Sequence, residues 1–137
     1  MVLKVFTDGG SKGNPGPSSI GGVGYIGEKK VFEFKKSIGI ATNNEAEYRA
    51  LIEALTNTKS QISRLRQDYG GQVKIEFFSD SRLLVNQVNG FFKVKNGKIR
   101  EYILKIRVLE QEVNLPIFYH YVPREKNLEA DRLVNAV

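Results

Sequence analysis

Cysteine and tryptophan are absent from this sequence of 137 residues, and histidine occurs once, as His120. The lack of cysteine excludes disulfides, thiolate zinc sites and a thiol nucleophile. A single histidine also excludes metal sites built from several imidazoles. If this chain binds a metal, we therefore expect oxygen atoms to hold it.

Long apolar runs are also missing, so we expect no membrane span, and Lys4 interrupts the apolar start that a signal peptide would need. We therefore expect a cytoplasmic protein with one domain over residues 1–137. The net charge of +6 and the pI near 9.5 favour a polyanionic partner. Many basic domains bind no nucleic acid, so charge alone does not identify that partner.

Hydrophobic periodicity predicts strands and helices in the order βββαβααβα. We expect strands at residues 2–7, 20–30, 31–40, 73–79 and 116–122, and helices at residues 42–55, 81–90, 97–113 and 127–137. Thr42, three residues before Glu45, forms a capping box that starts the first helix. A run of hairpins followed by strand–helix alternation predicts an α/β fold with a five-stranded mixed sheet. Three antiparallel strands come first, parallel strands follow, and helices cover both faces.

Two aspartates follow predicted strands that should be parallel neighbours. Asp8 comes after "VLKVFT" and Asp80 after "VKIEFFS". Neighbouring strands lie about 5 Å apart, so the two carboxylates should meet where the strands end. Either residue alone is equally consistent with an aspartate that forms a turn or caps a helix. Small or polar residues follow both, which leaves the carboxylates uncovered.

Two more acids lie among apolar helix positions. Glu47 precedes Ala50 and Leu51 by three and four residues, on the side of the helix that should face the core. Asp131 lies three residues after Leu128 in the last helix. Each acid has a structural alternative, since Glu47 could reach solvent from the edge of its stripe and Asp131 could be an exposed surface acid. The functional interpretation directs both towards the two aspartates.

Four converging carboxylates would repel one another unless a cation joined them. Oxygen ligands suit Mg²⁺ or Mn²⁺, which take further ligands from phosphate. Two such ions about 4 Å apart can activate water and stabilise the leaving oxygen in phosphodiester hydrolysis. The basic charge of the chain would attract the polyanionic substrate.

Four segments together resemble the catalytic blocks of the type 1 ribonuclease H family: "TDGGSKGNPGP", "TNNEAEYRAL", "SDS" and "VPREKNLEADRL". The resemblance spans nearly the whole chain and implies the ribonuclease H-like fold. It implies an endonuclease that uses two Mg²⁺ or Mn²⁺ ions to cleave the RNA strand of RNA–DNA hybrids, leaving 5′-phosphomonoesters. The family's metal-binding quartet carries over to Asp8, Glu47, Asp80 and Asp131.

The resemblance also implies substrate contacts. Positions that contact the RNA strand in the minor groove, or lie where similar contacts are made, correspond to Asn14, Asn43, Asn44, Ser81 and Arg82. Asparagine suits this role because its amide can both donate to and accept from 2′-hydroxyls and base edges. Positions of a pocket for a DNA-strand phosphate correspond to Thr42 and Asn96, and Thr42 is equally consistent with a plain helix cap. The small residues Gly9, Gly10 and Ser11 after Asp8 let a substrate approach the backbone.

Two departures from the family matter for the mechanism. The tryptophan- and lysine-rich protrusion of some members is reduced to "FFKVKNGK". The mobile loop that carries a histidine in many members is shortened to "PREKN", and His120 precedes it within a strand. Arg124 is then the candidate to contact the scissile phosphate or the product, although an arginine cannot readily transfer a proton. An exposed loop charge is the alternative for Arg124.

Three functions stay open. The first is the hybrid-cleaving endonuclease, acting as a monomer, with double-stranded RNA as a second candidate substrate. The second is a non-catalytic module of the same fold that binds hybrids or double-stranded RNA, although four clustered acids would weaken phosphate binding without a metal. The third is another nuclease of the ribonuclease H-like superfamily, such as an integrase or a Holliday-junction nuclease.

Overall fold

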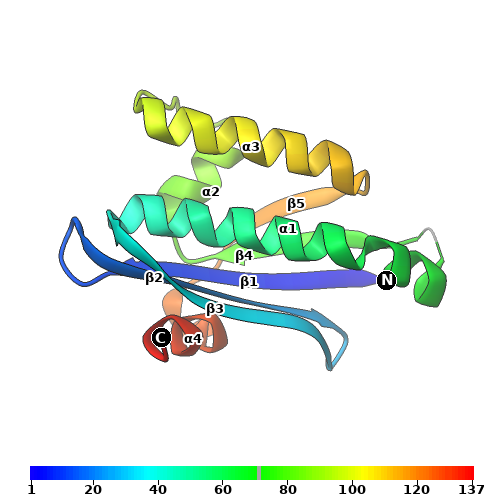
Figure 1. Cartoon of the computed structure of the whole chain (residues 1–137). Helices are drawn as coiled ribbons and strands as arrows, with labels where there is room; N and C mark the ends of the chain where they lie inside the picture. The colour runs from blue at the N-terminus through cyan, green and yellow to red at the C-terminus, as the bar shows by residue number, and fades with distance from the viewer. Residues whose placement is uncertain (71) are drawn as a thin grey trace.

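The computed structural model describes residues 1–70 and 72–137, and its elements follow the predicted order (Figure 1). The strands are β1 (Val2–Ser11), β2 (Gly16–Ile26), β3 (Lys29–Ala41), β4 (Lys74–Ser79) and β5 (Ile117–Tyr121). The helices are α1 (Asn43–Tyr69), α2 (Arg82–Val88), α3 (Gly97–Val113) and α4 (Leu128–Asn135), with a 3-10 turn, η1 (Arg124–Lys126), before the last. The sequence pattern does not predict the η1 turn.

The five strands form one mixed sheet in the order β3-β2-β1-β4-β5. The pairs β1–β2 and β2–β3 are antiparallel, whereas β1–β4 and β4–β5 are parallel. Helices α1 and α3 cover one face and α4 covers part of the other (Figure 1). This arrangement confirms the predicted α/β fold. No helix in the described residues combines the length and the hydropathy that a membrane crossing needs.

Helix α1 begins at the capping box predicted from Thr42. The Thr42 hydroxyl oxygen accepts the Glu45 N–H at 3.1 Å, and the Glu45 carboxylate accepts the Thr42 N–H at 2.9 Å. The apolar stripe of α1 is buried against the sheet, as the 3.6-residue period predicts, through Ala46, Ala50, Leu51, Ala54 and Leu55. This packing fixes the rotation of α1 and therefore the direction of every other side chain on it.

Two glycines let helices approach the sheet backbone closely. A Cβ on Gly9 of β1 would lie 2.3 Å from the Ala46 carbonyl of α1. A Cβ on Gly21 of β2 would lie 2.8 Å from the Leu133 Cβ of α4. Only glycine fits at either contact, because real Cβ atoms do not approach so closely. Helices α1 and α4 are thus held close to neighbouring strands on opposite faces of the sheet.

The predicted end of the first strand, before Asp8, is wrong. Strand β1 continues to Ser11, because β2 pairs beside it through Asp8↔Gly21 and onward to Ser11↔Ser18. Its pairing with β4 stops earlier, at Phe6↔Phe78. The prediction followed the glycine-rich composition, which is typical of a turn, whereas an antiparallel partner supports these residues as strand. Asp8 therefore lies inside a strand, just past the point where the β4 neighbour ends.

Candidate active site

Asp8 and Asp80 meet because β1 and β4 are parallel neighbours. The last pair in their ladder is Phe6↔Phe78, and each aspartate lies two residues beyond its member of that pair. Side chains two residues apart on a strand point to the same face. The shared direction and register bring the two carboxylates together, as the sequence predicts.

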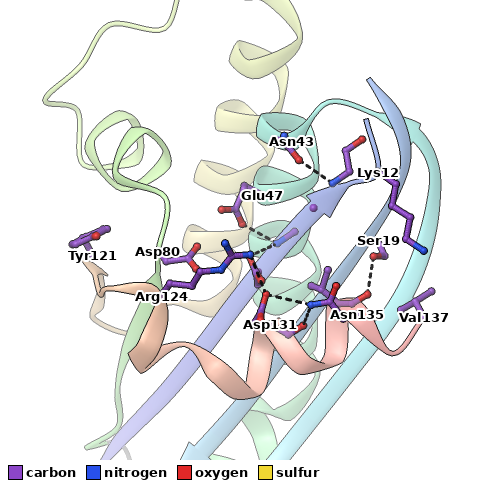
Figure 2. A pocket seen from close by; sticks show the side chains of 15 residues that line it. Lys12, Ser19, Asn43, Glu47, Asp80, Tyr121, Arg124, Asp131, Asn135 and Val137 are labelled. Atoms are coloured by element: carbon purple, nitrogen blue, oxygen red, sulfur yellow. Dashed lines mark hydrogen bonds and ion pairs between the residues drawn. The ribbon is translucent and has the colours of Figure 1, made fainter. Parts of the chain in front are cut away.

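Glu47 reaches the same point from helix α1. The Glu47 carboxylate accepts the Gly9 N–H at 2.8 Å, and the Asp8 carboxylate accepts the same N–H at 3.0 Å. One carboxylate oxygen from each of Asp8, Glu47 and Asp80 lies within 4.8 Å of the other two. Figure 2 shows Glu47 and Asp80 directed towards this point from different elements. The alternative of a solvent-directed Glu47 is thereby excluded.

Crowding and burial raise the pKa values of these three acids. Burial, the Asp80 charge and the contact with Asp131 raise the pKa of Asp8 from 3.8 to about 7, against the opposing Gly9 amide. Burial, followed by the charges of Asp8 and Asp80, raises the pKa of Glu47 well above its ordinary value. Burial also raises the pKa of Asp80, while the Arg124 guanidinium and the Asn127 amide oppose the rise. The cluster is thus a site of unfavourable negative charge.

Asp131 joins the cluster from α4, on the other face of the sheet (Figure 2). Its contact with Asp8 contributes to the raised pKa of that residue. The Arg124 Nη2 atom lies 3.6 Å from the Asp131 Oδ1 atom, and the Arg124 side chain is 77% exposed. The Asn135 amide donates to the Asp131 carbonyl at 2.9 Å. The fourth predicted acid and the predicted arginine therefore lie beside the three clustered carboxylates.

A cleft with a volume of about 520 Å³ opens over the carboxylates. The predicted site residues that line it are Asp8, Gly9, Gly10, Ser11, Asn43, Glu47, Asp80, Arg124 and Asp131. Other predicted residues lie outside its lining: Asn14, Thr42, Asn44, Ser81, Arg82 and Asn96. The structure thus brings together the acids, the glycine-rich segment and Arg124, but not every residue assigned to the substrate.

Asn14 does not line the cleft but is hydrogen-bonded to Asn43, which does. The Asn14 side-chain oxygen accepts the Asn43 N–H at 3.0 Å, and the Asn43 side-chain oxygen accepts the Ser11 N–H at 2.9 Å. These bonds tie the β1–β2 hairpin to the start of α1. Both side-chain oxygens are used as acceptors, so the amide N–H groups of the two asparagines are the donors available to a substrate.

Three further predicted residues are helix caps. The side chains of Thr42, Ser81 and Asn96 accept backbone N–H groups at the starts of α1, α2 and α3. Capping uses the acceptor side of each group, so a phosphate could still be bound through a hydroxyl or amide donor. Arg82 lies with its guanidinium 4.3 Å from the centre of the Tyr121 ring, at the edge of the cleft that Tyr121 lines. Asn44 lies in the first turn of α1.

Sequence reasoning missed several cleft residues, including Lys12, Ser19, Tyr121 and Asn135. Lys12 belongs to the glycine-rich segment that the sequence already marks, and Asn135 follows Asp131 by four residues, one helical turn. These signals could have identified both. Nothing local distinguishes Ser19, which enters the site because its hydroxyl donates to the Val134 carbonyl of α4 at 2.9 Å.

His120 lies in β5, as predicted, and is not among the described residues that line the cleft. Its ring packs against Phe78 with the ring centres 5.2 Å apart, and its Nε2 atom is 3.3 Å from a Glu76 carboxylate oxygen. This position agrees with the expectation that His120 packs near the site without entering it.

We predict that His120→Ala will lower the free energy of unfolding by about 1 kcal/mol, because a half-buried ring contact is lost, and will leave kcat unchanged. Urea unfolding followed by circular dichroism, together with a steady-state assay of the hybrid cleavage expected from the sequence, measures both effects. A folded His120→Ala protein without activity would contradict the assignment.

The residues at the centre of the cleft fit a divalent cation. Mg²⁺ binds oxygen at about 2.1 Å, so its ligands lie up to about 4.2 Å apart, and small side-chain movements would bring the three acids to that spacing. A cation would also relieve the repulsion that raises their pKa values. Asp8, Glu47 and Asp80 would hold it, with Asp131 and Asp8 able to share a second.

Comparisons with known proteins identify the family and support the fold. A model of the RNase H family matches residues 2–136. The bifunctional protein Rv2228c of Mycobacterium tuberculosis is 36% identical over 98% of this chain, which spans only 35% of that relative. Ribonuclease HI of Halobacterium salinarum is 36% identical over 97% of this chain and 62% of its own length. The structure of LC11-RNase H1 in complex with an RNA/DNA hybrid is 37% identical, with a TM-score of 0.83, over 98% of this chain and 95% of that one. The fold, the order of its elements and a family match over nearly the whole length agree, and the chain belongs to the RNase H family.

Proposed function

We propose that this protein hydrolyses the RNA strand of RNA–DNA hybrids with two divalent metal ions. The observation that carries the proposal is the group of three carboxylate oxygens within 4.8 Å of one another, lining an open cleft in a chain of net charge +6. Carboxylates alone would repel a phosphodiester, so the arrangement makes chemical sense with cations bound. The solved complex of LC11-RNase H1 with a hybrid supports the substrate class.

The residues divide between holding ions and orienting the substrate. Asp8, Glu47, Asp80 and Asp131 would hold the two ions, which would supply activation of water and charge stabilisation at the leaving 3′-oxygen. The small residues Gly9 and Gly10 let the RNA backbone approach the cleft floor. Our proposal has the amide N–H groups of the paired asparagines Asn14 and Asn43 contact the 2′-hydroxyls that distinguish RNA from DNA.

Arg124 supplies the exposed cation beside the acids. Its guanidinium is 3.6 Å from the Asp131 carboxylate and lies at the mouth of the cleft, where a phosphate bound over the acids would meet it. Because a guanidinium stays protonated at all working pH values, Arg124 stabilises charge on the phosphate or the product and does not transfer a proton. The products are oligonucleotides with 5′-phosphates.

Magnesium is the proposed physiological ion, with manganese as a substitute. Double-stranded RNA is a secondary candidate substrate, since it shares the A-like strand and the 2′-hydroxyls. A monomer in the cytoplasm remains the expectation from the sequence.

A cleavage assay tests the proposal. End-labelled RNA–DNA hybrid, double-stranded RNA and double-stranded DNA are incubated with the protein and Mg²⁺, Mn²⁺ or EDTA. We expect the RNA of the hybrid to be cut with either ion, and cutting to stop in EDTA and in Asp80→Asn. Tight hybrid binding without cleavage under any metal would favour the non-catalytic module instead. Cleavage of DNA junctions in preference to hybrids would favour another nuclease of the superfamily.

A further inference from the structure

Asn127 occupies the position before α4 at which an asparagine ordinarily caps its own helix. Its side chain makes no capping bond. The residue is 1% exposed, and its side-chain Nδ2 donates to the Thr7 carbonyl of β1 at 2.9 Å. The amide is therefore directed into the molecule, towards the strand that carries Asp8.

This amide lies where β1 and β4 separate. The ladder between the two strands ends at Phe6↔Phe78, so Thr7 is one residue past the last pair and directly precedes Asp8. The Asn127 amide also opposes the rise in the pKa of Asp80, the residue that follows β4. One side chain thus bonds to β1 directly before Asp8 and acts on the charge of Asp80.

Asn127 also connects to the third element of the site. Its carbonyl accepts the Asp131 N–H at 3.1 Å, the bond that starts α4. In addition, its side-chain oxygen is buried and has no hydrogen-bond partner among the described residues. An unpaired buried acceptor calls for an explanation, and beside the acids a role in the site is one that fits.

We propose that Asn127 is a positioning residue that fixes the spacing of the Asp8, Asp80 and Asp131 carboxylates and thereby sets the affinity of the site for divalent ions. The inference rests on the proposed function, in which these acids hold metal. It concerns a residue that contacts carboxylates and their backbone rather than the substrate. Residues that orient metal ligands typically change metal affinity about 10- to 100-fold when they are removed.

Calorimetric titration of the substrate-free protein with MgCl₂ tests the inference. We expect Asn127→Ala to weaken Mg²⁺ binding about tenfold or more. The matched control is Asn89→Ala, because the Asn89 side chain also donates to a strand carbonyl, that of Tyr119 at 3.2 Å, away from the acids. Asn89→Ala should lower the melting temperature and leave the dissociation constant for Mg²⁺ unchanged.

A folded Asn127→Ala protein with wild-type affinity for Mg²⁺ would overturn the inference and leave Asn127 a structural residue. If Asn127→Ala does not fold, Asn127→Ser replaces it, since serine is smaller and cannot reach both strands; wild-type Mg²⁺ affinity in that variant would equally overturn the inference. A different result would overturn the proposed function: a wild-type protein that binds Mg²⁺ and cuts no hybrid. In that case the titration would still decide the role of Asn127.

Discussion

Asp8→Asn is expected to abolish cleavage and, in the absence of metal, to stabilise the protein. The activity loss follows because the variant lacks a negative ligand that both proposed metal positions share. We expect kcat to fall at least about 1,000-fold. Single-turnover cleavage of a labelled hybrid at saturating Mg²⁺ measures the loss.

The expected gain in stability follows from the burial and crowding of the same carboxyl. The pKa of Asp8 is raised from 3.8 to about 7, so the folded protein holds the Asp8 proton more tightly than the unfolded chain does. Asp8 therefore costs no stability below pH 3.8, and the cost grows as pH rises to about 7 and is constant above it. Asparagine is neutral throughout and can still accept the Gly9 N–H. At pH 8 in EDTA the free energy of unfolding should rise by roughly 2–4 kcal/mol.

Urea unfolding at pH 4 and pH 8 measures this gain, which should be large at pH 8 and close to zero at pH 4. The control is Asp68→Asn, the same substitution at an exposed position of α1, which should change stability by less than about 0.5 kcal/mol at either pH. Added Mg²⁺ should stabilise the wild type and not Asp8→Asn. An equal gain at both pH values would mean that the burial and repulsion of the Asp8 charge are not its source.

The four acids could be predicted from the sequence because each depends on a regular element. Asp8 and Asp80 each lie two residues beyond the last pair of β1 and β4, so they are directed to the same side. The apolar stripe of α1 places Glu47 on or beside the core-facing side, and the bond from the Gly9 N–H decides between the two. These are consequences of the periods of 2 residues in strands and 3.6 in helices, which the apolar residues of this sequence follow. The positions of these acids could be predicted without knowing the conformation of the loops.

The rest depends on contacts that sequence patterns do not show. An asparagine before a helix predicts a cap, yet Asn127 is directed inward because β1 leaves its Thr7 carbonyl unpaired by β4. Ser19 likewise enters the site only because its hydroxyl donates to the Val134 carbonyl of α4 at 2.9 Å. In both cases a tertiary contact decides where the side chain lies, and the glycine-rich composition that ended the predicted strand before Asp8 misled because it does not show the antiparallel partner β2.

Arg124→Ala is expected to lower kcat about 10- to 100-fold with the fold intact. The side chain is 77% exposed and its ion pair with Asp131 is long at 3.6 Å, so its removal should cost little stability. Arg124 would contribute to catalysis through the positive charge that it directs at a phosphate bound over the acids. Removing one such group from a buried site lowers kcat about 100-fold or more. Because Arg124 is exposed to solvent, we expect a smaller loss of kcat.

The matched control is Lys126→Ala, which removes a cation from the same η1 turn but from a residue that does not line the cleft in the described structure. Lys126→Ala should change KM slightly through the net charge and leave kcat unchanged. Equal losses in the two variants would mean that Arg124 contributes only to the general attraction of the polyanion.

Two further measurements separate charge from proton transfer at Arg124. Arg124→Lys keeps the charge without the planar fork, so it should recover part of the lost kcat. Because we assign Arg124 to charge stabilisation and not to proton transfer, the kcat–pH profiles of wild type and Arg124→Ala should have the same shape and differ only in height. If kcat no longer falls at acidic or at basic pH in Arg124→Ala as it does in the wild type, Arg124 controls a titrating group. If the shape is retained, a charge at the shortened loop stabilises the phosphate or product, and the proton for the leaving oxygen comes from elsewhere, such as water.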